Sequence, residues 1–341
     1  MDLAALGIAR ESIVDFSTCL NPYGPCPTVV DAVRAAPIDC YPDPTARAVR
    51  ENLAEILDVD PDAVVFGNGS TELLWTIARV LLAPGESVVI VEPTFSEFRA
   101  AAEATGARVV ELRLDWADGF RLDLGRLRTL LRTVRPRAVY LCAPNNPTGV
   151  AVPAVEIAAV AGEHPDVSIV LDQAFLSLSE AFGDLMVRFP PNLLCVRSLT
   201  KDFAIPGVRA GYLLCARDTS AHIEAARPAW ATSTIAQAAA LAACASRGFV
   251  DETRPRLLGD RDHLQMVVRR RGLDPLPSVT PFFLVRVPDS GELRRRLLVR
   301  HRVLVRDCAS FGLPDFIRLS ARLPAEVARL DVALREEVLA C

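Results

Sequence analysis

Short apolar segments that alternate with helical segments run from residue 63 to residue 215, and no other feature restricts the fold as strongly. The segments are nearly continuous in aliphatic residues, as expected of strands that are buried on both faces. Such strands, separated by helices at 71–82, 96–105 and 124–133, predict an α/β fold with a mostly parallel sheet between two helical layers. We expect seven strands, at residues 63–66, 87–91, 108–112, 138–142, 168–171, 193–197 and 211–215.

The pattern changes near residue 220, which predicts a second, smaller α+β domain. Helices at 235–247 and 254–271 lead into strands at 282–287, 303–306 and 316–319, with helices at 292–299 and from 324. Residues 1–30 are rich in proline and predict an irregular arm that packs on the small domain or on a partner subunit. We therefore expect a large domain at 31–225 and a small domain at 226–341, with the functional site between them at the carboxyl ends of the strands.

Charge and cysteine content exclude several classes of protein. The net charge of −4 provides no basic field, so a nucleic-acid partner is not expected. The longest apolar runs are too short to span a bilayer, and the chain opens without a signal-peptide pattern, which predicts a cytoplasmic protein without membrane segments. The nine cysteines are scattered without a C-x-x-C pair, so neither a disulfide framework nor a metal site is expected.

Lys201 is the only lysine in a chain whose Lys and Arg residues together number 38. Arginine replaces lysine readily in ion pairs, but a guanidinium stays charged and cannot attack a carbonyl. Biased codon usage would also leave a single lysine by chance. The neighbourhood favours a reactive amine, because Lys201 follows an apolar strand and precedes Arg209 across a Pro-Gly turn. A reactive lysine beside a phosphate-binding arginine is the arrangement of a pyridoxal phosphate (PLP) site.

Two further segments could hold the phosphate and the ring of such a cofactor. Residues 67–72, Gly-Asn-Gly-Ser-Thr-Glu, follow a strand and open a helix, where backbone N–H groups and the helix dipole favour an anion. Asp172 comes at the end of an apolar strand and could pair with a pyridinium nitrogen. Both also suit plain structural roles, as a strand-to-helix turn and as a helix N-cap.

Three other residues are candidates for contacts with a cofactor or a substrate. Asn146, in the segment Asn-Asn-Pro-Thr-Gly, could donate to the 3-oxygen of the ring or form an ordinary Asx-Pro turn. Phe95 could stack on a planar ring or pack in the core. Arg318 lies between apolar residues and needs an anion, either a substrate carboxylate or a carboxylate of this chain.

Taken in this order, the motifs resemble those of the class I and II aminotransferase family of fold-type I PLP enzymes, over nearly the whole chain. Residues 15–24 and 197–209 are most similar to threonine-phosphate decarboxylases of cobalamin synthesis, and next to histidinol-phosphate aminotransferases. The resemblance implies the PLP-dependent transferase fold of type I with a smaller C-terminal domain. It is carried by residues 41–44 (Tyr-Pro-Asp-Pro), 67–72, 92–95 (Glu-Pro-Thr-Phe), 144–149 (Pro-Asn-Asn-Pro-Thr-Gly), 172–175 (Asp-Gln-Ala-Phe), 198–201 (Ser-Leu-Thr-Lys) and 209.

The resemblance implies a role toward PLP for each residue that matches a motif. Lys201 is expected to form the Schiff base and to move protons at the substrate α-carbon, and Asp172 to hold the pyridinium. Asn146 is expected to contact the 3-oxygen, and Phe95 to stack on the ring. The residues expected to hold the phosphate are Gly69, Ser70, Thr71, Ser198 and Arg209.

The resemblance also implies a homodimer with shared active sites, because Tyr41 is expected to reach the phosphate of the neighbouring subunit's cofactor. The substrate is expected to be a small amine or amino acid. The residues expected to contact this substrate are Arg318, Arg322, Asn21 and Tyr23.

Four positions depart from the family pattern, and none is a main cofactor contact. Phe175 stands where many aminotransferases have tyrosine, Cys19 where asparagine is expected, Gln173 where glutamate is usual, and Asp202 where a bulky aromatic is more typical. We therefore expect a PLP enzyme, an aminotransferase first, that acts at the α-carbon of an amino acid or amino-phosphate. Three alternatives stay open: decarboxylation of an O-phosphorylated amino acid, a secondary-metabolism reaction by elimination, replacement or ring formation, and a module that binds without turnover.

Overall fold

A seven-stranded sheet forms the centre of the larger part of the molecule, as the alternation predicts. The computed structural model describes residues 3, 6–184 and 190–338. Within these residues the strand order across the sheet is β2-β8-β7-β6-β5-β3-β4. The strands are β2 (Val64–Asn68), β3 (Ser87–Glu92), β4 (Arg108–Arg113), β5 (Ala138–Cys142), β6 (Ser168–Asp172), β7 (Leu193–Ser198) and β8 (Ala210–Leu214).

The sheet is parallel from β7 to β4, and β8 runs antiparallel to both of its neighbours. Residues 199–209, which join β7 to β8, are fewer than the dozen or more that a parallel crossover needs. The chain therefore turns back and pairs antiparallel. This short connection is the segment that carries Lys201, so the fold confines the lysine to a tight turn at the end of β7.

Helices cover both faces of the large sheet, which confirms the three-layer prediction. Leu193 and Cys195 of β7 pack in one apolar core, and Leu194 and Val196 pack in the other. The first core includes residues of α1 (Pro27–Ala35), α2 (Arg47–Leu57), α5 (Leu124–Val134), α6 (Ala154–Glu163) and α8 (Thr234–Ala245). The second includes residues of α3 (Gly69–Leu81), α4 (Glu97–Ala104) and α7 (Arg217–Ala225).

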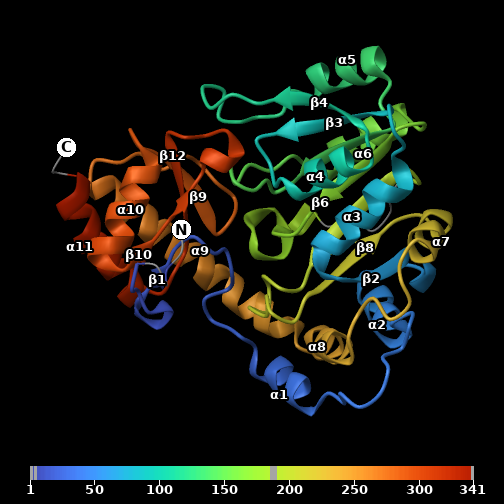
Figure 1. Cartoon of the computed structure of the whole chain (residues 1–341), viewed down its shortest axis with the longest axis horizontal. Helices are drawn as coiled ribbons and strands as arrows, with labels where there is room; N and C mark the ends of the chain where they lie inside the picture. Colours follow the sequence, from blue (N-terminus) through green and yellow to red (C-terminus); the bar gives the residue numbers. More distant parts are fainter. Residues whose placement is uncertain (1–2, 4–5, 185–189, 339–341) are drawn as a thin grey trace.

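The C-terminal elements form a smaller α+β group beside the large sheet (Figure 1). Its sheet is antiparallel, with the order β11-β12-β9, and has its own apolar core. The long helix α9 follows α8 and leads into this group (Figure 1). The elements are α9 (Arg247–Arg270), β9 (Phe282–Arg286), α10 (Ser290–His301), β10 (Val303–Leu304), β11 (Arg306–Asp307), β12 (Phe316–Ser320) and α11 (Pro324–Val338).

The N-terminal segment joins the C-terminal group through a short strand. In β1 (Val14–Asp15), Val14 pairs with Val303 and Asp15 pairs with Leu304 of β10, in parallel. The expectation of an irregular segment over 1–30 is wrong at its end, because α1 begins at Pro27. Proline suits the first position of a helix, where its missing N–H has no partner to lose. The boundaries of the arm and of the two domains stay predictions.

Other differences from the predicted elements are local. The strand expected at 303–306 is divided into β10 and β11, which join different sheets. Helix α9 starts at Arg247, earlier than expected, and continues through Pro255. No helix within the described ranges is long and apolar enough to cross a membrane. The short 3-10 helices are η1 (Arg10–Ser12), η2 (Pro61–Ala63), η3 (Leu176–Leu178), η4 (Glu180–Asp184) and η5 (Ala309–Phe311).

Candidate active site

Four neighbouring parallel strands bring the predicted residues to one edge of the sheet. Asp172 is the last residue of β6 and Ser198 the last of β7, and both side chains are buried. Phe95 follows β3, and its half-buried ring packs against the second apolar core. Asn146 follows β5. The carboxyl edge of a parallel sheet is where α/β folds place their ligands.

Lys201 lies in the turn after β7 and points its amine at the strand end. Its Nζ donates to Ser198 Oγ at 3.4 Å, and the backbone N–H of Asn21 donates to its carbonyl at 3.1 Å. Burial lowers the pKa of Lys201; nearby Asp172 opposes this effect and Arg209 adds to it. A lysine with a lowered pKa is more readily neutral, and the neutral amine is the nucleophile.

Asp172 is held by two hydrogen bonds and can accept more. The backbone N–H of Ala174 donates to Oδ1 at 2.9 Å, and the Tyr140 hydroxyl donates to Oδ2 at 3.1 Å. Burial raises the pKa of Asp172, against the opposing effects of the Ala174 bond and Lys201. A carboxylate has about four acceptor sites, so Asp172 can still accept from a ring N–H.

Tyr140 is a site residue that the sequence analysis missed. It lies in the middle of β5 and is fully buried. An apolar strand hides it, since a tyrosine there looks like any core aromatic. The available signal was its hydroxyl, because a buried tyrosine O–H needs a partner. The partner is Asp172, on the adjacent strand.

An anion-binding corner forms where α3 begins. Gly69 starts the helix with φ at +78°, and the N-cap position makes no side-chain capping bond. A Cβ at Gly69 would lie 2.5 Å from Arg209 Nη2, so the guanidinium is pressed against the first turn. A Cβ at Gly211 would lie 2.5 Å from the backbone nitrogen of Ser70. The N–H groups of Ser70 and Thr71, beside Arg209, could hold an anion such as a phosphate, and this role stays a prediction.

Arg318 reaches this site from the small sheet. Its Nη1 donates to Asn146 Oδ1, and its Nη2 donates to the carbonyl of Ser17 at 2.8 Å. Its guanidinium also lies over the Phe282 ring, 5.1 Å from the centroid. The Nε atom is buried and has no partner among the described residues. The guanidinium makes no ion pair with any described carboxylate, so its charge is available to an external anion.

Two of the departures from the family pattern meet in a small apolar cluster. Cys19 and Phe175 pack with Phe282, and the rings of Phe175 and Phe282 meet edge to face at 4.8 Å. Burial raises the pKa of the Cys19 thiol. Near the guanidinium of Arg318 this cluster therefore presents apolar side chains. It lacks the hydroxyl that a tyrosine at the position of Phe175 would add.

Three predicted substrate residues are held by other protein groups. Asn21 Nδ2 donates to the carbonyl of Asp202 and to Thr253 Oγ1, at 3.1 and 2.8 Å. The Tyr23 hydroxyl donates to Asp260 Oδ2 at 2.5 Å, and Arg322 forms an ion pair with Glu326. A substrate contact for Asn21, Tyr23 and Arg322 stays a prediction.

Tyr41 lies in the loop between α1 and α2, which runs along the lower edge of Figure 1. Its side chain is 78% exposed. Its ring packs on Trp230, with centroids 4.7 Å apart, and Trp230 is itself exposed. The two rings form an apolar patch at the surface of the chain.

Comparison with known proteins agrees with this geometry. The family model "Aminotransferase class I and II" matches residues 11–334. A histidinol-phosphate aminotransferase of Symbiobacterium thermophilum is 34% identical over 336 residues, which cover 96% of this chain and 91% of that protein. One of Thiobacillus denitrificans is also 34% identical, over 98% of this chain and 88% of its own.

Two solved structures share the fold over nearly their whole length. The histidinol-phosphate aminotransferase of Sinorhizobium meliloti, solved with pyridoxal-5'-phosphate, superimposes with a TM-score of 0.90 at 28% identity, covering 99% of this chain and 94% of its own. The L-threonine-O-3-phosphate decarboxylase of Porphyromonas gingivalis gives 0.83 at 27% identity, over 96% of this chain and all of its own. Because the family model matches almost the full length of this chain, the chain belongs to the class I and II aminotransferases.

Proposed function

We propose that this chain is a PLP-dependent aminotransferase that acts at the α-carbon of a small amine carrying an acidic group. The observation that supports it most is the position of Lys201. A buried amine with a lowered pKa lies beside Ser198, under the field of Asp172 and Arg209, at the carboxyl edge of the sheet.

The donor set of the site fits PLP. Uncapped N–H groups at the start of α3 and the adjacent Arg209 suit a phosphate dianion. Asp172 suits a protonated ring nitrogen, and the side-chain amide of Asn146 suits the ring 3-oxygen. When bound, PLP supplies an electrophilic aldehyde carbon and a protonated ring that withdraws electrons from the α-carbon of an amine.

The protein groups have distinct tasks in such a reaction. Lys201 would hold the cofactor through its amine, and the same amine, when neutral, would take the proton from the substrate α-carbon and carry it to the cofactor rather than back to the same carbon. Asp172 keeps the ring nitrogen protonated, and Tyr140 holds the Asp172 carboxylate in place. Arg318 would bind the acidic group of the substrate and so orient the bonds of its α-carbon.

The test is spectroscopic and uses Lys201→Ala. Wild-type protein with PLP should show a visible absorbance band that differs from free PLP, and the band should shift when an amino donor is added. The variant should lack the attached-cofactor band and turn over no substrate, because no other lysine exists in the chain. Wild-type protein without a band, or a variant that retains turnover, would contradict the proposal. Histidinol phosphate, which the names of the relatives carry, is the first donor to test.

Decarboxylation is the second candidate, supported by the likeness to a threonine-phosphate decarboxylase at 27% identity. The same ring can withdraw electrons from a carboxylate bond if Arg318 orients that bond perpendicular to it. Release of CO₂ from threonine phosphate without formation of a keto acid would favour this reaction. Keto-acid formation without CO₂ would favour transamination.

We also propose a homodimer in which Tyr41 serves the partner's site, with the exposed Tyr41–Trp230 patch as part of the contact. Sedimentation should give a dimer. Mixed subunits of Tyr41→Ala and Lys201→Ala should recover more activity than either alone, since one site of each hybrid then has both residues. Monomers, or hybrids without recovery, would refute this arrangement.

A cytoplasmic location is proposed as well, supported by the eight described cysteines, all unpaired. Cell fractionation tests it, and recovery of the native protein in a secreted fraction would contradict it.

A further inference from the structure

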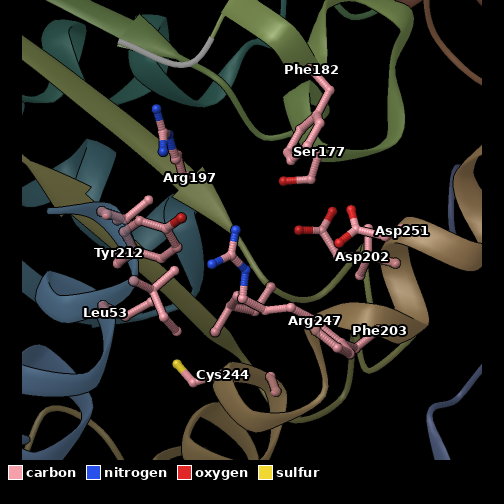
Figure 2. Close-up of a pocket in the computed structure, with 15 residues that line it drawn as sticks. Leu53, Ser177, Phe182, Arg197, Asp202, Phe203, Tyr212, Cys244, Arg247 and Asp251 are labelled. Carbon is pink, nitrogen blue, oxygen red and sulfur yellow. The ribbon is translucent and has the colours of Figure 1, made fainter. Parts of the chain in front are cut away.

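A separate pocket lies behind the Lys201 turn and is lined by Arg197 of β7 and by Asp202 and Phe203 of the turn (Figure 2). Side chains alternate along a strand, so Arg197 lies on the face of Leu193 and Cys195, toward α2 and α8. The pocket has a volume of about 80 Å³. Its apolar walls come from α2, α8, α9 and the turn after β7, and include Leu53, Leu199, Phe203, Ala243 and Val250.

A buried guanidinium lines one side of the pocket. Arg197 is 4% exposed, and its Nε donates to Gln173 Oε1 at 3.0 Å. Gln173 is neutral, so this hydrogen bond does not itself compensate the charge of Arg197. The Nη2 atom is buried and has no partner in the described part of the chain. A buried cation of this kind is costly unless an anion meets it.

A buried carboxyl group lines the opposite side. Asp202 is 5% exposed, and its Oδ1 atom has no hydrogen-bond partner among the described residues. Burial raises the pKa of Asp202 to about 7, and Ser177, Lys201, Arg254 and Arg197 act against this effect. A cationic donor in contact with Oδ1 would remove the penalty of burying this group.

At the pocket mouth Arg247 adds a second guanidinium, whereas Asp251 is already paired with Arg254. Figure 2 shows the guanidinium groups of Arg197 and Arg247 on one side and the carboxyl groups of Asp202 and Asp251, with Ser177, on the other. Arg247 and Asp251 are exposed, so the pocket opens to solvent. A ligand that fits must carry a negative and a positive end a short distance apart.

We propose that this pocket is a second binding site, for a free α-amino acid with a small apolar side chain. Its carboxylate binds Arg197 and Arg247, its ammonium binds Asp202, and its side chain contacts Leu53 and Val250. This site goes beyond the proposed reaction and does not need PLP. Since Asp202 directly follows Lys201, occupancy of the pocket acts on the Lys201 turn, as a regulatory ligand would.

The test must separate this pocket from the cofactor site, where amino acids also react. Borohydride reduction of the PLP enzyme fixes the cofactor on Lys201, so amino acids can no longer react with the cofactor. Calorimetric titration of the reduced enzyme with glycine, L-alanine and L-valine should then detect one further site. Propionate lacks the ammonium and ethylamine lacks the carboxylate, so each should bind at least roughly tenfold more weakly than alanine.

Variants assign the binding to the pocket. Asp202→Asn removes the anion without changing the shape, and Arg247→Ala removes an exposed guanidinium at little risk to folding. Each should weaken alanine binding roughly tenfold or more. Arg270→Ala, an exposed arginine at the far end of α9, should bind as the wild type does. Unreduced wild-type enzyme should change its turnover when the pocket ligand is added, and Arg247→Ala should not.

Two outcomes would overturn the proposal: no heat of binding for any of the three amino acids, or unchanged affinity in both pocket variants. Failure of borohydride to fix PLP would instead refute the proposed function. The titration would then be repeated on protein without PLP, where the pocket is the same.

Discussion

Replacing Asp202 by asparagine should make the protein less sensitive to rising pH. Burial raises the pKa of Asp202 from 3.8 to about 7. The folded state therefore holds this proton more tightly than the unfolded state does. The stability that the proton contributes is fully present below the unfolded pKa and is lost as the pH rises through the folded pKa. An asparagine amide does not titrate, so Asp202→Asn loses nothing over this range.

The size of the effect follows from the two pKa values. Each unit of difference is worth about 1.4 kcal/mol, so the complete loss is about 4 kcal/mol. Between about pH 5 and about pH 8, the linkage relation gives a loss of about 3 kcal/mol. The free energy of unfolding of the variant, minus that of the wild type, should rise by this amount. Groups that titrate alike in both proteins cancel in the difference.

Urea unfolding of both proteins across this pH range, at fixed protein and PLP concentrations, measures the difference. Asp118→Asn is the matched control for the substitution itself, because the Asp118 side chain is exposed and makes no ion pair with a described residue. A flat or falling difference for Asp202→Asn would refute the argument that burial outweighs the neighbouring cations at Asp202. An amino acid bound in the pocket should reduce the change of this free-energy difference with pH.

Three other substitutions test the cofactor and substrate contacts. Gly69→Ala places a Cβ 2.5 Å from Arg209 Nη2 and should raise the dissociation constant for PLP roughly 10- to 100-fold in an absorbance titration; unchanged affinity would remove Arg209 from the phosphate site. Tyr140→Phe removes the donor to Asp172 and should lower kcat roughly tenfold while PLP still binds, whereas an equal loss of bound PLP would indicate a structural role only. Arg318→Ala should raise KM for an acidic donor roughly 100-fold with the cofactor band intact, and an unchanged KM would exclude Arg318 as the anion contact.

The local pattern of the chain was enough to locate most elements of the large sheet. Strands buried on both faces must be apolar along their whole length, and that requirement is visible in sequence as at 138–142 and 193–197. The reactive lysine was equally visible, because Lys201 is unique in composition and lies in a recognisable turn. The start of α1 was missed because prolines at 22, 25 and 27 look alike in sequence, while one of them can open a helix.

Contacts between distant segments were decided only by the tertiary structure. Arg318 meets Asn146 across 172 residues, and the bond between Tyr140 and Asp172 depends on which strands are neighbours. Strand order and loop closure set these distances, and no local period encodes them.

The same limit applies to the pocket behind Lys201. By itself, the sequence determined that Asp202 and Gln173 depart from the family pattern. The sequence does not show whether the side chains of Asp202 and Gln173 are exposed or buried. That depends on the face of β7 on which Arg197 lies and on the helices that pack against this face. The fold buries Arg197 and Asp202 in one pocket without neutralising either by direct contact, and burial is what makes their charges consequential.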